Sequence, residues 1–188
     1  MWKAILAAML FLQAPGKSIY SQVEVPQNAS PPCDDEYSLL CSPPRGSEAH
    51  GAYTVAENWE QGLRRYSTIA RALDDVVAQE RWKSPRSHLW RYTLAFAYHE
   101  SGFRRDVHSG VGSASRGDCR WHTTKNGERE RIPGSCRSHC LAQIMLGPKN
   151  SFAKTSEGYK PTDLTGTDYD STKRCMEVAV RIIDGAYQ

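Results

Sequence analysis

The sequence predicts a mainly α-helical protein with a single folded domain, and three observations lead to this class. The chain has 188 residues, 39% of them apolar and 24% charged, which suits one sizeable core. Apolar residues recur at three- and four-residue steps in several segments, as on one face of a helix. Strand-type alternation is weak throughout. We expect the helical domain to cover residues 53–188, behind two N-terminal segments of different composition.

The first of these segments, residues 1–21, has the layout of a secretory signal peptide. Lys3 precedes an apolar run at 4–12 that is too short to span a bilayer. Cleavage is expected between Ala14 and Ser21, and a buried helix of the mature fold is the alternative. No second apolar stretch of spanning length follows, so we expect a mature chain without a membrane span, in the periplasm or outside the cell.

Residues 22–52 form the second segment, a Pro- and Ser-rich arm that contains two cysteines. An even set of six cysteines in an exported chain indicates disulfides rather than free thiols. The sequence leaves the pairing open. The pairs that we favour are Cys33 with Cys41, Cys119 with Cys136, and Cys140 with Cys175.

Two well-defined helices are predicted in the first half of the domain. One begins at Thr54, which forms a capping-box pair with Glu57, and continues to about residue 77. The next begins with Ser84-Pro85, an N-cap followed by a first-turn proline, and ends near Gly102. Because few polar positions interrupt this second helix, we expect it to be largely buried.

The second half of the domain has weaker patterns. Residues 104–134 are rich in Gly, Ser and charge, and we expect an irregular loop there. Ser135 can cap a third helix that continues to Leu146 and stops before Gly147-Pro148. A fourth helix is predicted over about 171–186. Its apolar face consists of Cys175, Val178, Ala179 and Ile182.

Glu100 is the candidate catalytic residue. It lies in the last turn of an apolar helix, where the backbone dipole opposes a negative charge, and it follows several aromatic residues. Both features favour the protonated form, and a carboxyl group that is protonated near neutral pH can donate to a glycosidic oxygen. The alternative is a glutamate at a helix end that simply faces solvent.

Two short motifs carry a resemblance to a known family. Residues 100–103, Glu-Ser-Gly-Phe, and residues 140–145, Cys-Leu-Ala-Gln-Ile-Met, resemble motifs of the soluble lytic transglycosylase and goose-type lysozyme superfamily. In that family a helix ends in Glu-Ser-x-Phe, and a second helix begins with a Gly-Leu-Met-Gln-like motif that lines the sugar cleft. The resemblance covers about residues 89–183. It implies a lysozyme-like fold and cleavage of the β-1,4 bond between N-acetylmuramic acid and N-acetylglucosamine in peptidoglycan.

The resemblance also implies a role for individual residues. By this resemblance Glu100 corresponds to the catalytic acid and base of the family, and Ser101 to the serine that supports it. Gln143 is the glutamine of the cleft, and we count Ser101, Phe103 and Gln143 as the expected substrate-binding residues of the two motifs. The core-facing residues beside Gln143 are Leu141 and Ile144.

The sequence departs from the family pattern at three points. Cys140 and Ala142 replace the glycine and the methionine of the second motif. The chain between the two motifs is longer than usual, which implies an inserted loop that the second of the favoured disulfides can close. A later Ala-Tyr-Asn motif is represented only by Ala186-Tyr187.

The number of carboxylates decides which reaction is expected. Hydrolytic glycosidases use two, whereas in the resembled family one acid protonates the leaving oxygen and then takes a proton from the C6 hydroxyl of the sugar, giving a 1,6-anhydro end. Asp118, in the turn sequence Arg116-Gly117-Asp118, is a possible second carboxylate, as is Asp106, and either can equally be a solvated loop acid. We rank a lytic transglycosylase first, a hydrolytic lysozyme second, and a catalytically weak wall-binding protein third.

Two other kinds of site are compatible with the residue types. A Cys-His protease would need a free thiol beside His99 or His108, which an even cysteine count does not supply. A zinc site is disfavoured because the ligand spacing matches no standard pattern and an oxidising location favours disulfides. We therefore expect neither a metal nor a cofactor. The zinc ligands considered are Cys136, His139, Cys140 and His122.

Trp121 and a group of basic residues lie in the long loop. An aromatic ring on a hydrophilic loop can stack on a sugar, so Trp121 is a candidate substrate contact, with core packing as the alternative. The basic group is expected to be a solvated face or a contact with anionic wall groups. A net charge of only +3 does not indicate nucleic acid, so peptidoglycan is the expected partner of a monomeric chain. The basic group is Lys125, Arg129, Arg131 and Arg137.

Overall fold

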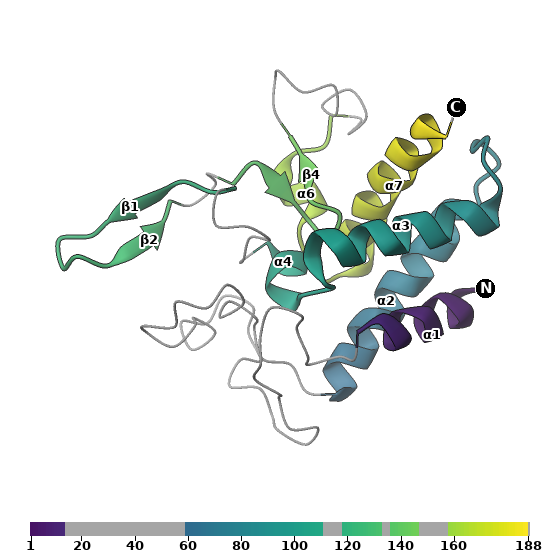
Figure 1. Cartoon of the computed structure of the whole chain (residues 1–188), viewed down its shortest axis with the longest axis horizontal. Coiled ribbons are helices and arrows are strands. Elements are labelled where there is room, and N and C mark those ends of the chain that lie inside the picture. The colour runs from purple at the N-terminus through teal and green to yellow at the C-terminus, as the bar shows by residue number, and fades with distance from the viewer. Residues whose placement is uncertain (14–58, 111–117, 133–135, 147–157, 188) are drawn as a thin grey trace.

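The computed structural model of the chain describes residues 1–13, 59–110, 118–132, 136–146 and 158–187. These ranges are mainly helical, as the sequence predicts (Figure 1). The helices are α1 (Trp2–Leu12), α2 (Trp59–Val77), α3 (Arg86–Ser101), α4 (Arg105–Ser109), α6 (Pro161–Leu164) and α7 (Tyr169–Ala186). Two short antiparallel ribbons accompany them, β1 (Trp121–Thr123) with β2 (Arg129–Arg131) and β3 (Ser138–His139) with β4 (Ile144–Met145).

Helices α2, α3 and α7 form what we call the helical body. α2 packs chiefly on α7 and α1, and α3 packs chiefly on α7. In the apolar stripe of α2, Ile69 and Leu73 are fully buried. The predicted apolar face of α7 is buried at Val178 and Ala179 and half-buried at Ile182. The periodicity of these two helices therefore predicts their core faces correctly. The predicted start of α2 at Thr54 lies outside the described residues.

The prediction that α3 is largely buried is wrong. Leu89, Leu94 and Ala97 face the core, but the opposite face of the helix is exposed and Tyr92 has half of its surface accessible. The helix packs on its neighbours along one side only, so apolar composition overstated its burial. The predicted end is correct, because Gly102 closes the helix in the left-handed conformation, with φ 58°.

The start of α3 is held from another helix. The helix begins at Arg86, and no side chain of its own caps it. Instead the carboxylate of Asp184, from α7, accepts hydrogen bonds from the backbone N–H groups of Ser84 (2.8 Å) and Lys83 (3.2 Å). The predicted N-cap role of Ser84 is thus replaced by a tertiary contact.

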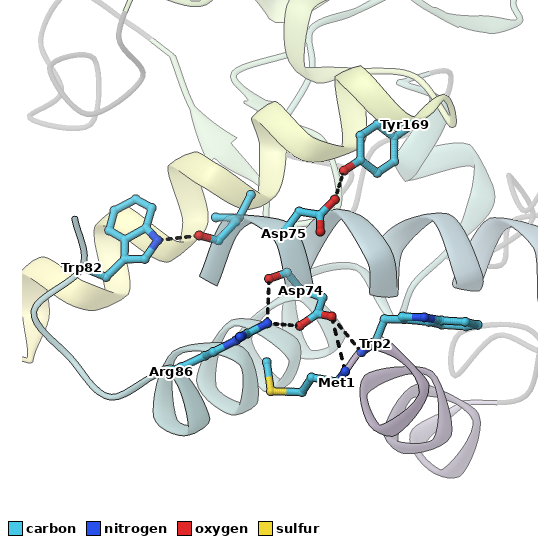
Figure 2. Close-up of polar contacts among 8 residues, drawn as sticks. Met1, Trp2, Asp74, Asp75, Trp82, Arg86 and Tyr169 are labelled. Atoms are coloured by element: carbon cyan, nitrogen blue, oxygen red, sulfur yellow. Dashed lines mark hydrogen bonds and ion pairs between the residues drawn. The ribbon is translucent and has the colours of Figure 1, made fainter. Parts of the chain in front are cut away.

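The N-terminal helix α1 lies against the helical body, with Ile5 and Met9 in the apolar core. Figure 2 shows its polar anchor on α2: Asp74 accepts a hydrogen bond from the Trp2 N–H (2.9 Å) and forms ion pairs with Arg86 (2.6 Å) and the Met1 ammonium (3.5 Å). The leader assigned to residues 1–21 stays a prediction. Among the described residues, no helix has both the length and the apolar character that a membrane crossing requires.

The second half of the domain corrects two sequence predictions. The helix predicted over 135–146 is wrong, because the chain forms the β3–β4 hairpin there. Cys140 and Gln143 have positive φ angles of 60° and 49°, which an α-helix cannot accommodate. The loop predicted over 104–134 is partly wrong, because it contains α4 and the β1–β2 ribbon.

Two disulfides stabilise this part of the chain, which we call the cross-linked segment (118–146). The predicted pairs Cys119–Cys136 and Cys140–Cys175 are both formed. The first joins the two ends of the chain around the β1–β2 ribbon, and the second joins the β3–β4 hairpin to α7. The predicted pair Cys33–Cys41 lies outside the described residues.

Candidate active site

Glu100 lies in the last turn of α3 and is half-buried. The two residues that follow the helix, Gly102 and Phe103, both have positive φ angles, 58° and 53°, so the chain reverses sharply just after Glu100. Ser101 is fully buried, and its hydroxyl donates to the carbonyl of Ala97 at 2.8 Å. A turn with these restraints holds Glu100 on a rigid backbone.

Phe103 fixes the same turn from the core side. Its side chain is 1% exposed, and its ring contacts those of Tyr66 and Tyr98 with centroid distances of 5.7 Å and 5.6 Å. Edge-on and tilted aromatic contacts of this kind add to the stability that area burial provides. Ser101 and Phe103 therefore both lie beneath the surface, where they position the glutamate.

Gln143 lies in the turn of the β3–β4 hairpin and is half-buried. Its side-chain amide donates to the carbonyl of Cys140 at 2.9 Å, across the turn. Leu141 and Ile144 are buried in the core, as the resemblance implied. Because Cys140 is bonded to Cys175, the turn that carries Gln143 is attached covalently to α7.

Asp118 stabilises the β3–β4 hairpin through hydrogen bonds to Ser138 on β3. Its carboxylate accepts from the hydroxyl of Ser138 at 2.8 Å and from the Ser138 N–H at 3.1 Å. The carboxylate and the sulfurs of Cys119 and Cys136 lie close enough together to suggest a metal site, but the two sulfurs are bonded to each other. Cys136 and Cys140 are both in disulfides, so neither can act as a thiolate ligand of zinc or as the nucleophile of a Cys-His protease.

A buried polar cluster around α4 was not recognised from the sequence. Arg104 and Asp106 form an ion pair (2.5 Å) with both side chains almost fully buried. Burial raises the pKa of Asp106, and the Arg104 guanidinium offsets part of that rise. Asp106 is therefore enclosed and is not positioned as a second carboxylate toward a substrate. Adjacent charged residues in a glycine-rich stretch gave no periodic signal that could have predicted this burial.

His108 belongs to the same cluster. Its Nε2 is 2.8 Å from the hydroxyl of Thr172 on α7, and the imidazole is fully buried. Burial, together with the positive charge of Arg65, lowers the pKa of His108 well below its usual value. The cluster connects the turn after Glu100 to α7 through a neutral imidazole.

Trp121 lies on the β1–β2 ribbon, which extends away from the helices in Figure 1. It is half-buried and is paired with Arg131 across the ribbon. Two members of the predicted basic group, Arg129 and Arg131, are thus on β2, while Lys125 and Arg137 are exposed. Trp121 and these basic residues therefore belong to the cross-linked segment and not to the helical body.

Apart from Trp121 on the β1–β2 ribbon, the predicted site residues form two units. Ser101 and Phe103 position Glu100, and Asp118 and Cys140 position Gln143. Both units are attached to α7, the first because α3 packs on it and the second through the disulfide. Comparison of the chain with protein-family models, with curated proteins and with solved structures found no match.

Proposed function

We propose that the chain is an exported lytic transglycosylase that cleaves the β-1,4 bond between N-acetylmuramic acid and N-acetylglucosamine in peptidoglycan. The observation that carries the proposal is Glu100, a half-buried residue in the last turn of α3 that is followed by the buried Ser101 and Phe103. Within the described ranges, the Glu100 side chain has no hydrogen bond or ion pair. The carboxyl group is therefore available to a substrate, and the backbone that carries it is restrained by the turn.

The proposed reaction needs one carboxyl group in two roles. Glu100 donates its proton to the glycosidic oxygen as the bond from that oxygen to C1 of N-acetylmuramic acid breaks. The resulting Glu100 carboxylate then accepts the proton of the C6 hydroxyl of the same sugar, and the C6 oxygen forms a bond to C1. The products are a 1,6-anhydro end and a free hydroxyl on the leaving sugar. Glu100 ends protonated, and no water is consumed.

The surroundings of the other acids support one carboxylate over two. Asp118 is hydrogen-bonded to Ser138 within the hairpin, and Asp106 is enclosed with Arg104. A hydrolytic lysozyme would need a second carboxylate facing the bond that is cleaved. Neither acid is placed in the way that this role requires, which favours the transglycosylase reaction.

Export is supported by the cysteine chemistry. Both disulfides of the described residues join segments that are distant in sequence, by 17 and 35 residues. Such bonds persist in oxidising compartments and are rare in the cytosol. The leader predicted at residues 1–21 would direct the chain to such a compartment.

The test is a digestion of purified peptidoglycan with identification of the released ends by mass spectrometry. We expect 1,6-anhydro ends from the unmodified chain and at least about a 100-fold slower release from Glu100→Gln, because the amide cannot donate the proton. Glu60→Gln, an exposed position on α2, is the matched control and should act at the unmodified rate.

Each other result has a definite meaning. Reducing ends would indicate a hydrolase, and binding without release would indicate a wall-binding protein. Full activity of Glu100→Gln would remove Glu100 from the site whichever product appears. Thermal melting of both variants checks that they are folded.

A further inference from the structure

Four residues of α3 lie on one ridge that ends at Glu100. His88, Tyr92, Phe96 and Glu100 recur at intervals of four residues, so their side chains lie in one row, with a rise of about 6 Å per step. None of the four is buried: Tyr92 is 50% exposed and the other three are half-buried. A row of aromatic side chains therefore leads along the helix surface to the proposed catalytic acid.

Tyr187, which follows α7, widens this row at its far end. It is 51% exposed, and its ring centroid lies 5.7 Å from that of His88 and 5.9 Å from that of Tyr92. Its hydroxyl is 3.1 Å from Nδ1 of His88, which fixes the ring relative to α3. We call His88, Tyr92, Phe96 and Tyr187 the aromatic ridge.

We propose that the aromatic ridge binds the sugar rings of a glycan strand and guides the strand toward Glu100. The proposal rests on the function proposed above and adds a binding surface to it. A sugar ring has an apolar face of C–H groups and a rim of hydroxyls, and tyrosine and histidine offer an apolar face together with a polar end. Exposed aromatic rings held in mutual contact are therefore suited to stacking on sugars.

The shape of the ridge favours a linear polymer over a protein partner. A stable protein interface buries roughly 800 Å² on each partner and is built from about 20–30 residues a side. The ridge is one helix row wide, and its exposed rings are few. It is also continuous with Glu100, about 12 Å along the helix axis from Tyr92. A strand that reaches the acid can therefore extend over these rings.

The experiment measures binding without cleavage. Glu100→Gln protein is titrated with peptidoglycan glycan strands freed of their stem peptides, and the dissociation constant is measured. In that background, Tyr92→Ala with Tyr187→Ala should bind about tenfold more weakly, because two stacking rings are lost. Tyr92→Phe with Tyr187→Phe keeps both rings and should stay within about threefold. Tyr169→Ala removes an exposed tyrosine at the other end of α7 and should stay within about twofold.

The outcomes separate this proposal from the function itself. Unchanged binding by the folded alanine pair overturns the aromatic ridge and leaves Glu100 untouched. Equal loss in the phenylalanine pair also overturns it, because the rings would not be the cause. A change of oligomeric state in the alanine pair, measured by light scattering, would make the surface a contact between copies. Absence of any glycan binding by Glu100→Gln protein would overturn both proposals.

Discussion

The helical body and the cross-linked segment are stabilised by different interactions. In the body, apolar side chains such as Leu73 and Val178 are buried between helices. The cross-linked segment has fewer buried apolar residues, Leu141 and Ile144 among them, and is instead restrained by two disulfides and by the hydrogen bonds of Asp118.

This difference shows how the two candidate motifs are supported. Glu100 is positioned by a helix whose core face is buried, which is a property of non-covalent packing. Gln143 is positioned by a hairpin whose turn is joined to α7 by the Cys140–Cys175 bond, which forms only under oxidising conditions. We therefore expect reduction to disturb the Gln143 unit before the Glu100 unit.

The largest expected effect follows from removal of the Cys140–Cys175 bond. The double substitution Cys140→Ser with Cys175→Ser should lower the free energy of unfolding by about 4 kcal/mol, because a loop closed over 35 residues is released in the unfolded chain. The matched pair Cys119→Ser with Cys136→Ser removes a bond that closes a loop over 17 residues. It should lower the free energy of unfolding by about 3 kcal/mol or less. Chemical denaturation measures both, and a larger loss for the second pair would contradict the comparison.

An intermediate effect is expected from pH. The pKa of His108 is lowered by burial in the folded chain, so below pH 6.5 the unfolded chain binds a proton that the folded chain does not. The stabilising contribution is complete above pH 6.5 and is lost as the pH falls toward the folded pKa, by up to about 1.4 kcal/mol per pH unit.

His139 in the hairpin provides the comparison for this experiment. Burial also lowers its pKa, but the charge of Asp118 opposes that shift. The free energy of unfolding is measured with denaturant between about pH 7.5 and about pH 5. Its dependence on pH should be much flatter in His108→Gln than in the unmodified chain, whereas His139→Gln should alter this dependence less. A slope in His108→Gln equal to that of the unmodified chain would show that the buried imidazole does not control it.

The smallest effect is expected from Asp118→Asn. The amide keeps the shape of the side chain but loses charge-assisted acceptance from Ser138, which weakens the hairpin locally by about 1 kcal/mol. Hydrogen exchange at the Ser138 amide should accelerate about fivefold, with no change in the amides of α2. Loss of peptidoglycan cleavage from an intact hairpin would instead identify Asp118 as the second carboxylate.

The parts of the fold that follow from local pattern were predicted well. The end of α2, the glycine-terminated end of α3 at Gly102 and the span of α7 agree with the sequence analysis, because helical periodicity and capping act over a few residues. Two of the favoured disulfide pairs are also formed, although the sequence alone left the pairing open. The position of Glu100 at a helix end follows from the same local signals.

The sequence by itself determined where α2 and α3 end, the span of α7, the core faces of α2 and α7, and the location of Glu100 at the end of α3, because these depend on neighbours within one or two turns. Only the tertiary structure decided that Cys140 and Gln143 take the left-handed conformation in a hairpin, that Asp106 is enclosed with Arg104, and that Asp184 holds the start of α3. Each of these depends on a partner distant in the chain or on burial from solvent. A distant partner and burial from solvent produce no periodic pattern in the sequence.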